Sequence, residues 1–211
     1  MSSEPEHPHS GSLFVIAAPS GAGKTSLVKA LLQRELSLML SISHTTRAAR
    51  ATEHNGVDYF FISKDEFLTL KEQNHFVESA EVYGNLYGTS RPWLNQQLSA
   101  GRDVVLEIDW QGAKQIKAQY PNAVMIYILP PSLAVLEARL RSRGLDSSDV
   151  IMRRIAAAQE DMSHLADFEY VMINQDFNTA LQDLSHILFA ARLRTPVMRV
   201  KHQSLINSLV S

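Results

Sequence analysis

The sequence contains no cysteine, which excludes disulfides, thiolate metal sites and cysteine nucleophiles. It also lacks a long apolar run: residues 13–18, the longest run near the N-terminus, fall far short of the ~20 residues that a membrane-spanning helix needs. Residues 1–12 include Glu4 and Glu6 and lack the basic start and apolar stretch of a secretory signal. We therefore expect a cytoplasmic protein that has no membrane partner.

A large excess of charge of one sign is absent as well. The chain has 20 basic and 22 acidic residues, a formal net charge of −2. This balance excludes the broad cationic surface on which sequence-independent nucleic-acid binding depends, although it leaves room for a local basic pocket. Apolar residues make up 45% of the 211 residues, so the chain can bury a sizeable core without a metal or disulfide.

Four short apolar segments predict strands that are buried on both faces of a parallel sheet, because they lack strict alternation of apolar and polar residues. These segments are residues 13–18, 103–108, 123–129 and 170–173. Helical spacing is found at residues 24–35, 112–120, 132–143, 148–165 and 178–193. Ser132 is suited to cap the third of these helices. The alternation predicts an α/β fold built on a doubly wound parallel sheet.

The stretch 43–93 breaks this rhythm and is expected to form a small α+β insertion. Within it, residues 57–62 and 75–82 read as strands joined by a helix that begins at Ser63, which forms a capping-box pattern with Glu66. We expect a disordered tail at 1–11 and one domain at 12–192. Its core comprises 12–42, 94–138 and 167–192, and its flap or lid comprises 139–166. A helical extension at 193–211 has two possible partners, its own domain or another subunit, and we expect the former.

Residues 13–25 combine a strand, a turn of small residues and the start of a helix. The turn matches the Walker A pattern G-x-x-x-x-G-K-[ST], except that Ala18 replaces the first glycine, a substitution that is strained only at positive φ. Such a loop points several backbone N–H groups at one anion, and the helix N-terminus adds partial positive charge. The pattern predicts ATP-type phosphate binding, with Lys24 on the β/γ-phosphates and Thr25 on Mg²⁺. The expected ATP-binding loop is Ala18, Pro19, Ser20, Gly21, Ala22, Gly23, Lys24 and Thr25.

A second set of motifs points to an acceptor site. Arg47 and Arg50 are spaced to clasp one phosphate, although alone they would more often form an exposed basic loop. Four segments follow them in order and read GVDYFF at 56–61, FVE at 76–78, YGT at 87–89 and LEIDWQG at 106–112. Together with the loop APSGAGK at 18–24, this set resembles the guanylate kinase family, most closely its bacterial enzymes, over residues 12–192.

The resemblance implies a P-loop nucleoside monophosphate kinase that phosphorylates GMP to GDP with ATP, with Mg²⁺ arriving as a cofactor bound to ATP. The implied GMP-binding residues are Ser43, Arg47, Arg50, Tyr59, Glu78, Tyr87, Thr89 and Asp109. Of these, the arginines and tyrosines match positions that hold the GMP phosphate, whereas Glu78 matches the carboxylate that accepts hydrogen bonds from guanine N1–H and the 2-amino group. Ser43 and Thr89 match hydroxyls near guanine, and Asp109 matches an acidic contact near guanine and the metal. The implied catalytic residues are Lys24, Arg139, Arg143 and Arg154, and Asn174 matches an adenine contact.

The implied nucleophile is an oxygen of the GMP phosphate, which is already anionic, so no general base is required. A binding module for phosphorylated peptides is one alternative, but such domains typically degrade the phosphate loop, which is intact here. A kinase of ribose bisphosphate is another, but it leaves the set Ser43, Glu78 and Thr89 without a purpose. The expected partners are ATP and GMP and not nucleic acid; dGMP as a substrate and a second copy of the chain as a partner stay open.

Overall fold

The computed structural model describes residues 11–142 and 148–210, and of Ser148 only the backbone. Its centre is a five-stranded parallel sheet with the strand order β2-β7-β1-β8-β9. The strands are β1 (Leu13–Ala17), β2 (Leu38–Leu40), β7 (Asp103–Glu107), β8 (Val124–Leu129) and β9 (Tyr170–Ile173). The predicted α/β class is confirmed, and the four predicted strands are found with ends that differ by at most one residue.

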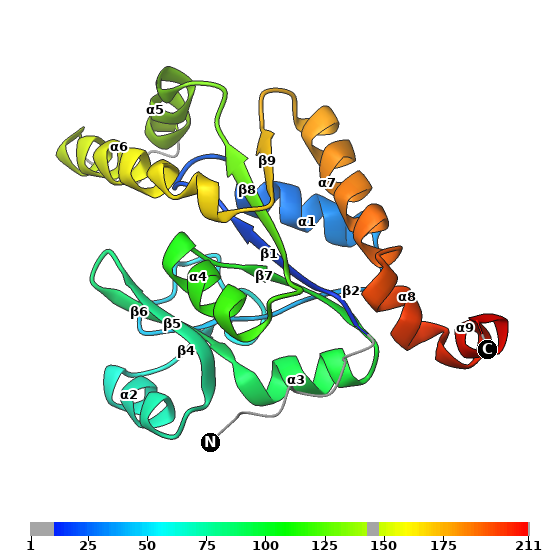
Figure 1. Cartoon of the computed structure of the whole chain (residues 1–211). Coiled ribbons are helices and arrows are strands. Elements are labelled where there is room, and N and C mark those ends of the chain that lie inside the picture. The colour runs from blue at the N-terminus through cyan, green and yellow to red at the C-terminus, as the bar shows by residue number, and fades with distance from the viewer. Residues whose placement is uncertain (1–10, 143–147, 211) are drawn as a thin grey trace.

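Helices cover both faces of this sheet (Figure 1). On one face, α1 (Lys24–Arg34) packs against α7 (Phe177–Arg192), and their apolar side chains meet Phe14 and Ile16 of β1. On the other face, α3 (Arg91–Ser99) and α4 (Trp110–Gln119) cover Leu13 and Val15. Successive residues of β1 therefore point into different cores, which explains why the strand is apolar without alternation.

A second, four-stranded sheet lies within the predicted insertion, in the order β4-β3-β6-β5. Its elements are β3 (His44–Thr45), β4 (Phe60–Phe61), α2 (Lys64–Glu72), β5 (Phe76–Val82) and β6 (Asn85–Ser90). The capping box is confirmed, because the Ser63 hydroxyl accepts a hydrogen bond from the Glu66 N–H at 3.1 Å. The predicted strand at 57–62 is found only in part: Phe60 and Phe61 form β4 and Tyr59 makes an isolated bridge with Asn55, since the chain before them turns through Gly56, whose φ is +76°.

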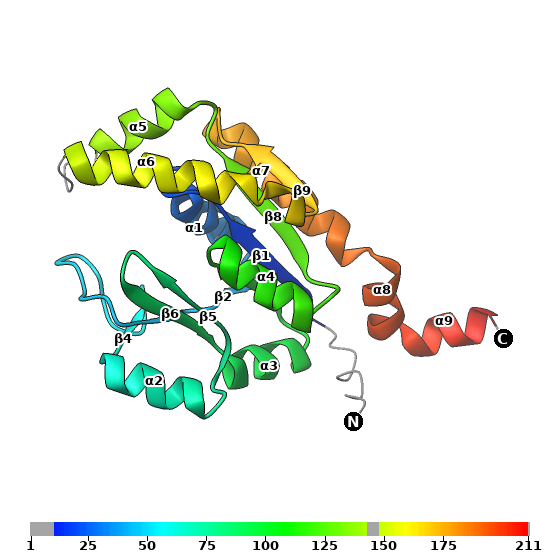
Figure 2. The same ribbon diagram turned by 60° about the vertical axis from the view of Figure 1, so that its left-hand side comes forward.

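The predicted lid, residues 139–166, takes in the end of α5 (Leu133–Ser142), all of α6 (Ser148–Ser163) and most of the short 3₁₀ helix η1 (Leu165–Asp167). The Ser132 hydroxyl caps α5 by accepting a hydrogen bond from the Val135 N–H at 3.2 Å, as predicted. Buried Leu136 and Leu140 of α5 pack against Ile151 and Ala158 of α6. Figure 2 shows this helical pair above the β5–β6 hairpin, with both parts beside the same end of the main sheet.

The chain ends in α8 (Thr195–Lys201) and α9 (Gln203–Val210), which lead away from the main body (Figure 1). No residue of either helix is buried, and Leu209 of α9 is 75% exposed. The expectation that this extension packs on its own domain is not met by α9, whereas Val197, Met198 and Val200 of α8 are partly buried. α8, which has Pro196 in its first turn, continues from the end of α7 away from the sheet and carries α9 away from the core. Within the described ranges, no helix is long and apolar enough to cross a membrane.

Candidate active site

The phosphate loop connects β1 to α1, where the pattern predicts it. Gly21 and Gly23 have φ values of +94° and +95°, which only glycine adopts without strain. A methyl group at Gly23 would also lie 2.4 Å from the side-chain nitrogen of Asn174. Ala18 is not among the described non-glycine residues with positive φ, so alanine is accommodated there without the backbone strain that positive φ would cause.

Side chains from distant segments hold this loop. The Ala22 carbonyl accepts hydrogen bonds from Asn174 Nδ2 at 2.7 Å and from Arg139 Nη1 at 3.2 Å, and Arg139 Nη2 donates to the Asn174 carbonyl at 3.0 Å. Arg154 Nη2 donates to the Ser20 hydroxyl at 2.9 Å. The structure thus brings Arg139, Arg154 and Asn174 to the loop.

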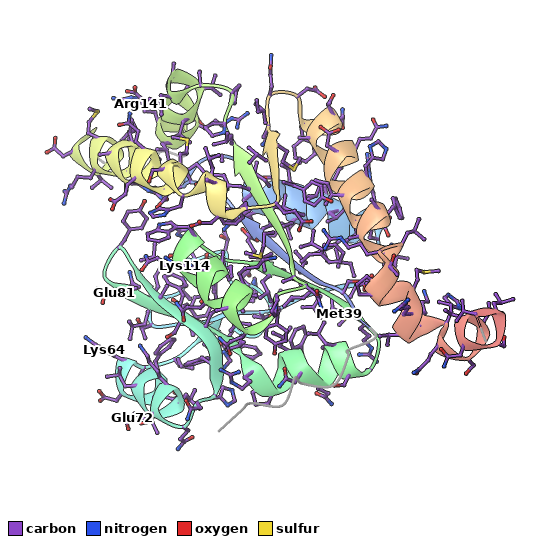
Figure 3. All side chains as sticks on the ribbon, in the orientation of Figure 1. Met39, Lys64, Glu72, Glu81, Lys114 and Arg141 are labelled. Carbon is purple, nitrogen blue, oxygen red and sulfur yellow. The ribbon has the colours of Figure 1, made fainter. Side chains whose placement is uncertain are left out.

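The other arginines of this region differ from these. Arg143 lies outside the described residues. Arg141 pairs with Glu137 at 2.7 Å on the exposed side of α5 and is labelled in Figure 3, and Arg153 is exposed on α6. The expectation that the neighbours Arg141 and Arg153 are surface charges is confirmed.

Acidic groups surround the end of the loop. Lys24 Nζ donates to the Ile108 carbonyl at 2.6 Å, and the Thr25 hydroxyl donates to the Glu107 carboxylate. Burial lowers the pKa of Lys24, while the charges of Glu107, Asp109, Asp161 and Glu78 act in the opposite direction. The sequence analysis missed Glu107 and Asp161. Glu107 could have been found from the sequence, since it ends a buried parallel strand beside the loop. Asp161, in the last turn of α6, carries no such signal.

The oxygen donors here suit a hard cation. A threonine hydroxyl and a carboxylate are ligands that Mg²⁺ accepts, usually together with substrate phosphates and water rather than within a protein cage. Among the described residues, no group of three or more histidine, aspartate or glutamate side chains is arranged to hold a metal. The side chains of Thr25 and Glu107 therefore fit a metal ion that is shared with a bound nucleotide.

A buried carboxylate marks the other half of the site. Glu78 on β5 is 3% exposed, and its Oε1 accepts a hydrogen bond from the Thr89 hydroxyl at 2.6 Å. Burial raises the pKa of Glu78 to about 7, with a smaller contribution from the charge of Asp109, and the Thr89 hydrogen bond opposes this rise. Asp109 caps α4 through the Gly112 N–H at 2.8 Å. Partly buried Ser43 lies directly before β3 in the same sheet.

The predicted phosphate-binding arginines and tyrosines also gather. The Arg47 guanidinium lies 5.4 Å from the centre of the Tyr59 ring, and the Tyr59 and Tyr87 rings are 5.9 Å apart. Glu53, which the sequence analysis missed, pairs with Arg47 at 2.8 Å and accepts a hydrogen bond from the Arg50 N–H at 2.8 Å. Its hydrogen bond raises the pKa of Arg47. Through these contacts Glu53 holds Arg47 and the exposed Arg50 close together, and the two arginines form a basic patch.

The two halves of the site touch each other. The Arg154 guanidinium of α6 lies 5.8 Å from the centre of the Tyr83 ring at the tip of the β5–β6 hairpin. The His164 ring stacks on Trp110 of α4, with ring centres 3.5 Å apart. The helical pair therefore contacts both the hairpin and the core, and the phosphate loop and Glu78 lie within electrostatic reach of each other.

A phosphate loop on a parallel sheet, with a small second sheet and a helical pair beside it, defines a P-loop nucleoside monophosphate kinase. The family model described as guanylate kinase matches residues 10–191. The guanylate kinase of Nitrosospira multiformis is 52% identical over 199 residues, covering 94% of this chain and 95% of that protein. The one of Dechloromonas aromatica is 51% identical over 200 residues, covering 95% and 99%. This chain belongs to the guanylate kinase family.

A solved structure agrees with this assignment. The crystal structure of guanylate kinase from Anaplasma phagocytophilum superposes with a TM-score of 0.74 at 31% sequence identity, and the match covers 92% of this chain and 96% of that one. The likeness therefore includes the second sheet and the helical pair as well as the central sheet.

Proposed function

We propose that the protein transfers the terminal phosphoryl group of ATP to GMP, giving ADP and GDP. The observation that carries this proposal is the buried Glu78 carboxylate, which lies opposite a complete phosphate loop. A carboxylate in this place matches the two adjacent donors of guanine, N1–H and the 2-amino group. Adenine lacks that pair, so AMP would leave a buried charge unsatisfied, which costs about 1–3 kcal/mol or more.

We assign the two substrates to the two halves of the site. Residues 18–25 receive the ATP phosphates, and the GMP site consists of Ser43, Arg47, Arg50, Tyr59, Glu78, Tyr87, Thr89 and Asp109. Asn174 supports the ATP site through the Ala22 carbonyl, and its contact with adenine stays a prediction. Residues 43–93 serve as the GMP-binding insertion, and residues 139–166 serve as the lid. We further propose that the enzyme acts in the cytoplasm.

Phosphoryl transfer needs positioning and charge neutralisation rather than a general base, because the attacking oxygen of GMP is already anionic. Lys24 keeps two ammonium hydrogens for phosphate oxygens while the third is bound by the Ile108 carbonyl. Arg139, Arg143 and Arg154 add positive charge from the lid. Thr25 and Glu107 would hold Mg²⁺, which neutralises phosphate charge when it is bound with ATP.

Turnover of single nucleotides tests the assignment. The protein is mixed with Mg·ATP and with GMP, dGMP, AMP or UMP separately, and ADP formation is followed. We expect GMP to be used far better than AMP or UMP, and we expect Lys24→Ala to abolish turnover while circular dichroism shows an intact fold. Equal use of AMP or UMP would overturn the guanine assignment. A protein that fails to bind ATP by calorimetry would instead support a binding module.

A further inference from the structure

β5, the strand that carries Glu78, lies at the edge of the second sheet, so only one of its sides pairs with a neighbouring strand, β6. Its register with β6 shifts between Phe76 and Glu78, which leaves Val77 as an extra residue directly before the carboxylate. Bulges of this kind redirect the side chains next to them. The direction of Glu78 therefore depends on how the backbone at Val77 and Ser79 is held.

Two glutamines of α4 hold this backbone on both sides of Glu78. The Gln115 side chain accepts a hydrogen bond from the Ser79 N–H at 3.1 Å and donates to the Ser79 carbonyl at 3.0 Å. The Gln119 side chain donates to the Val77 carbonyl at 2.6 Å. The Gln119 amide is itself fixed, because its oxygen accepts a hydrogen bond from Arg91 at 2.8 Å. The amides of α4 thus take the place of a further strand along β5.

The same face of α4 leaves room for the carboxylate. Gly112 lies one turn before Gln115, and a methyl group added to it would be 2.5 Å from Glu78 Oε2. The other carboxylate oxygen, Oε1, accepts the Thr89 hydrogen bond. Glu78 is therefore confined between the hydroxyl of Thr89 and the bare backbone of Gly112.

We propose that the Gly112–Gln115–Gln119 face of α4 is the positioning element that aims Glu78 at guanine, with Gln115 as a specificity-determining residue. This inference rests on the proposed function. Gln115 is a positioning residue and not a catalytic one, since its two hydrogen bonds go to the backbone of Ser79. Displacing a reacting or base-binding group by 1 Å can lower the rate about 100-fold. Loss of these hydrogen bonds should therefore weaken the binding and turnover of GMP.

The test compares GMP with IMP, which has the N1–H but no 2-amino group. Gln115→Met keeps the length of the side chain and removes both hydrogen bonds; the matched control is Gln96→Met, the same change at an exposed position of α3. We expect Gln115→Met to raise the KM for GMP about 10-fold or more and to reduce the ratio of kcat/KM for GMP over IMP, with the KM for ATP unchanged. Gln96→Met should leave all three values as in the wild type.

A second variant, Gly112→Ala, keeps the proposal testable if Gln115→Met does not fold. The methyl group of Gly112→Ala would meet the carboxylate ends of Glu78 and Asp109 rather than backbone, so we expect this variant to keep its thermal unfolding transition and to show the same loss of preference for GMP over IMP. If both variants fold and keep the wild-type ratio, the positioning role is wrong. A wild-type protein that does not prefer GMP contradicts the proposed function instead. A fall in active fraction with an unchanged KM and ratio would show that α4 contributes to stability only.

Discussion

At the scale of single residues, the site is marked by two ionisable groups, Glu78 and Lys24, whose pKa values are shifted by burial. Glu78 is a buried acid with a pKa of about 7, and its neighbour Thr89 donates to it. Lys24 is a cation whose pKa burial lowers, and it is surrounded by four acidic side chains. The carboxylate of Glu78 is suited to accept hydrogen bonds from a nucleobase, and the ammonium group of Lys24 is suited to bind phosphate oxygens.

The KM for GMP should depend on pH through Glu78. Guanine donates two hydrogen bonds, so only the ionised carboxylate accepts both, and the fraction ionised falls below the pKa of about 7. We expect the KM for GMP to rise toward about 10-fold per pH unit well below pH 7. Glu78→Gln is the control: it should raise the KM for GMP at every pH while retaining only the titration of the GMP phosphate. A Glu78→Gln profile parallel to that of the wild type would contradict this role.

The free energy of unfolding of the ligand-free protein should also depend on pH through Glu78. The folded-state pKa of Glu78 lies above its ordinary value of 4.5, so the unfolded chain binds fewer protons between pH 4.5 and 7 and stability falls as the pH rises through this window. We expect Glu78→Gln to be more stable than the wild type at pH 8, by at most about 3 kcal/mol, with the difference lost near pH 4. Urea denaturation at the two pH values measures this; equal differences at both would contradict it.

At the scale of elements, the site depends on contacts between segments far apart in the chain. β9 supplies Asn174 directly after its last residue, α5 supplies Arg139, and both reach one carbonyl of the phosphate loop. α4 supplies the glutamines that hold β5. The phosphate loop and the strand that carries Glu78 are thus each held by elements that do not follow them directly in sequence.

Asn174→Asp tests the support of the loop. The change keeps the size of the side chain but places a carboxylate oxygen against the Ala22 carbonyl, where the amide nitrogen now donates at 2.7 Å. We expect the KM for ATP to rise about 10-fold while GMP affinity, measured by calorimetry, stays unchanged. Asn207→Asp, the same change in exposed α9, should leave both values as they are. A normal KM for ATP in Asn174→Asp would show that the loop keeps its shape without this bond.

Features that depend on residues close together in the sequence could be predicted, whereas features that depend on contacts between distant segments could not. The strand, loop and helix around Lys24 are local, and the glycines that the loop needs stand in the motif itself, so this part is predicted correctly. β6 was not predicted, because glycine and polar residues interrupt its apolar pattern. Glu53 and Gln115 act through tertiary contacts, with Arg47 and with the edge of β5, and no spacing in the sequence marks them.

At the scale of the whole molecule, the structure consists of a rigid sheet with two smaller parts that meet beside it. The lid meets the insertion where Arg154 faces Tyr83, and it meets the core where His164 stacks on Trp110. The side chains at these two contacts are partly or largely exposed, which suits parts that open and close around substrates. α8 and α9 stand apart from this arrangement, with no buried residue.

Removing α9 should therefore have little effect on one molecule. A variant that ends at His202 loses α9, in which no residue is buried, so we expect its turnover of GMP to match that of the full chain and its melting temperature to change by no more than about 1 °C. Light scattering of both forms is the companion measurement. A clear drop in melting temperature together with a lower mass would show that the apolar face of α9 contacts another copy.

The glutamines along β5 have one more consequence. A free strand edge is a template on which other protein molecules add strands, and this is a route to aggregation. Gln115 and Gln119 occupy backbone groups of Val77 and Ser79 that would otherwise offer such a template. The two glutamines that position Glu78 therefore also hinder other protein molecules from adding a strand to the edge of β5.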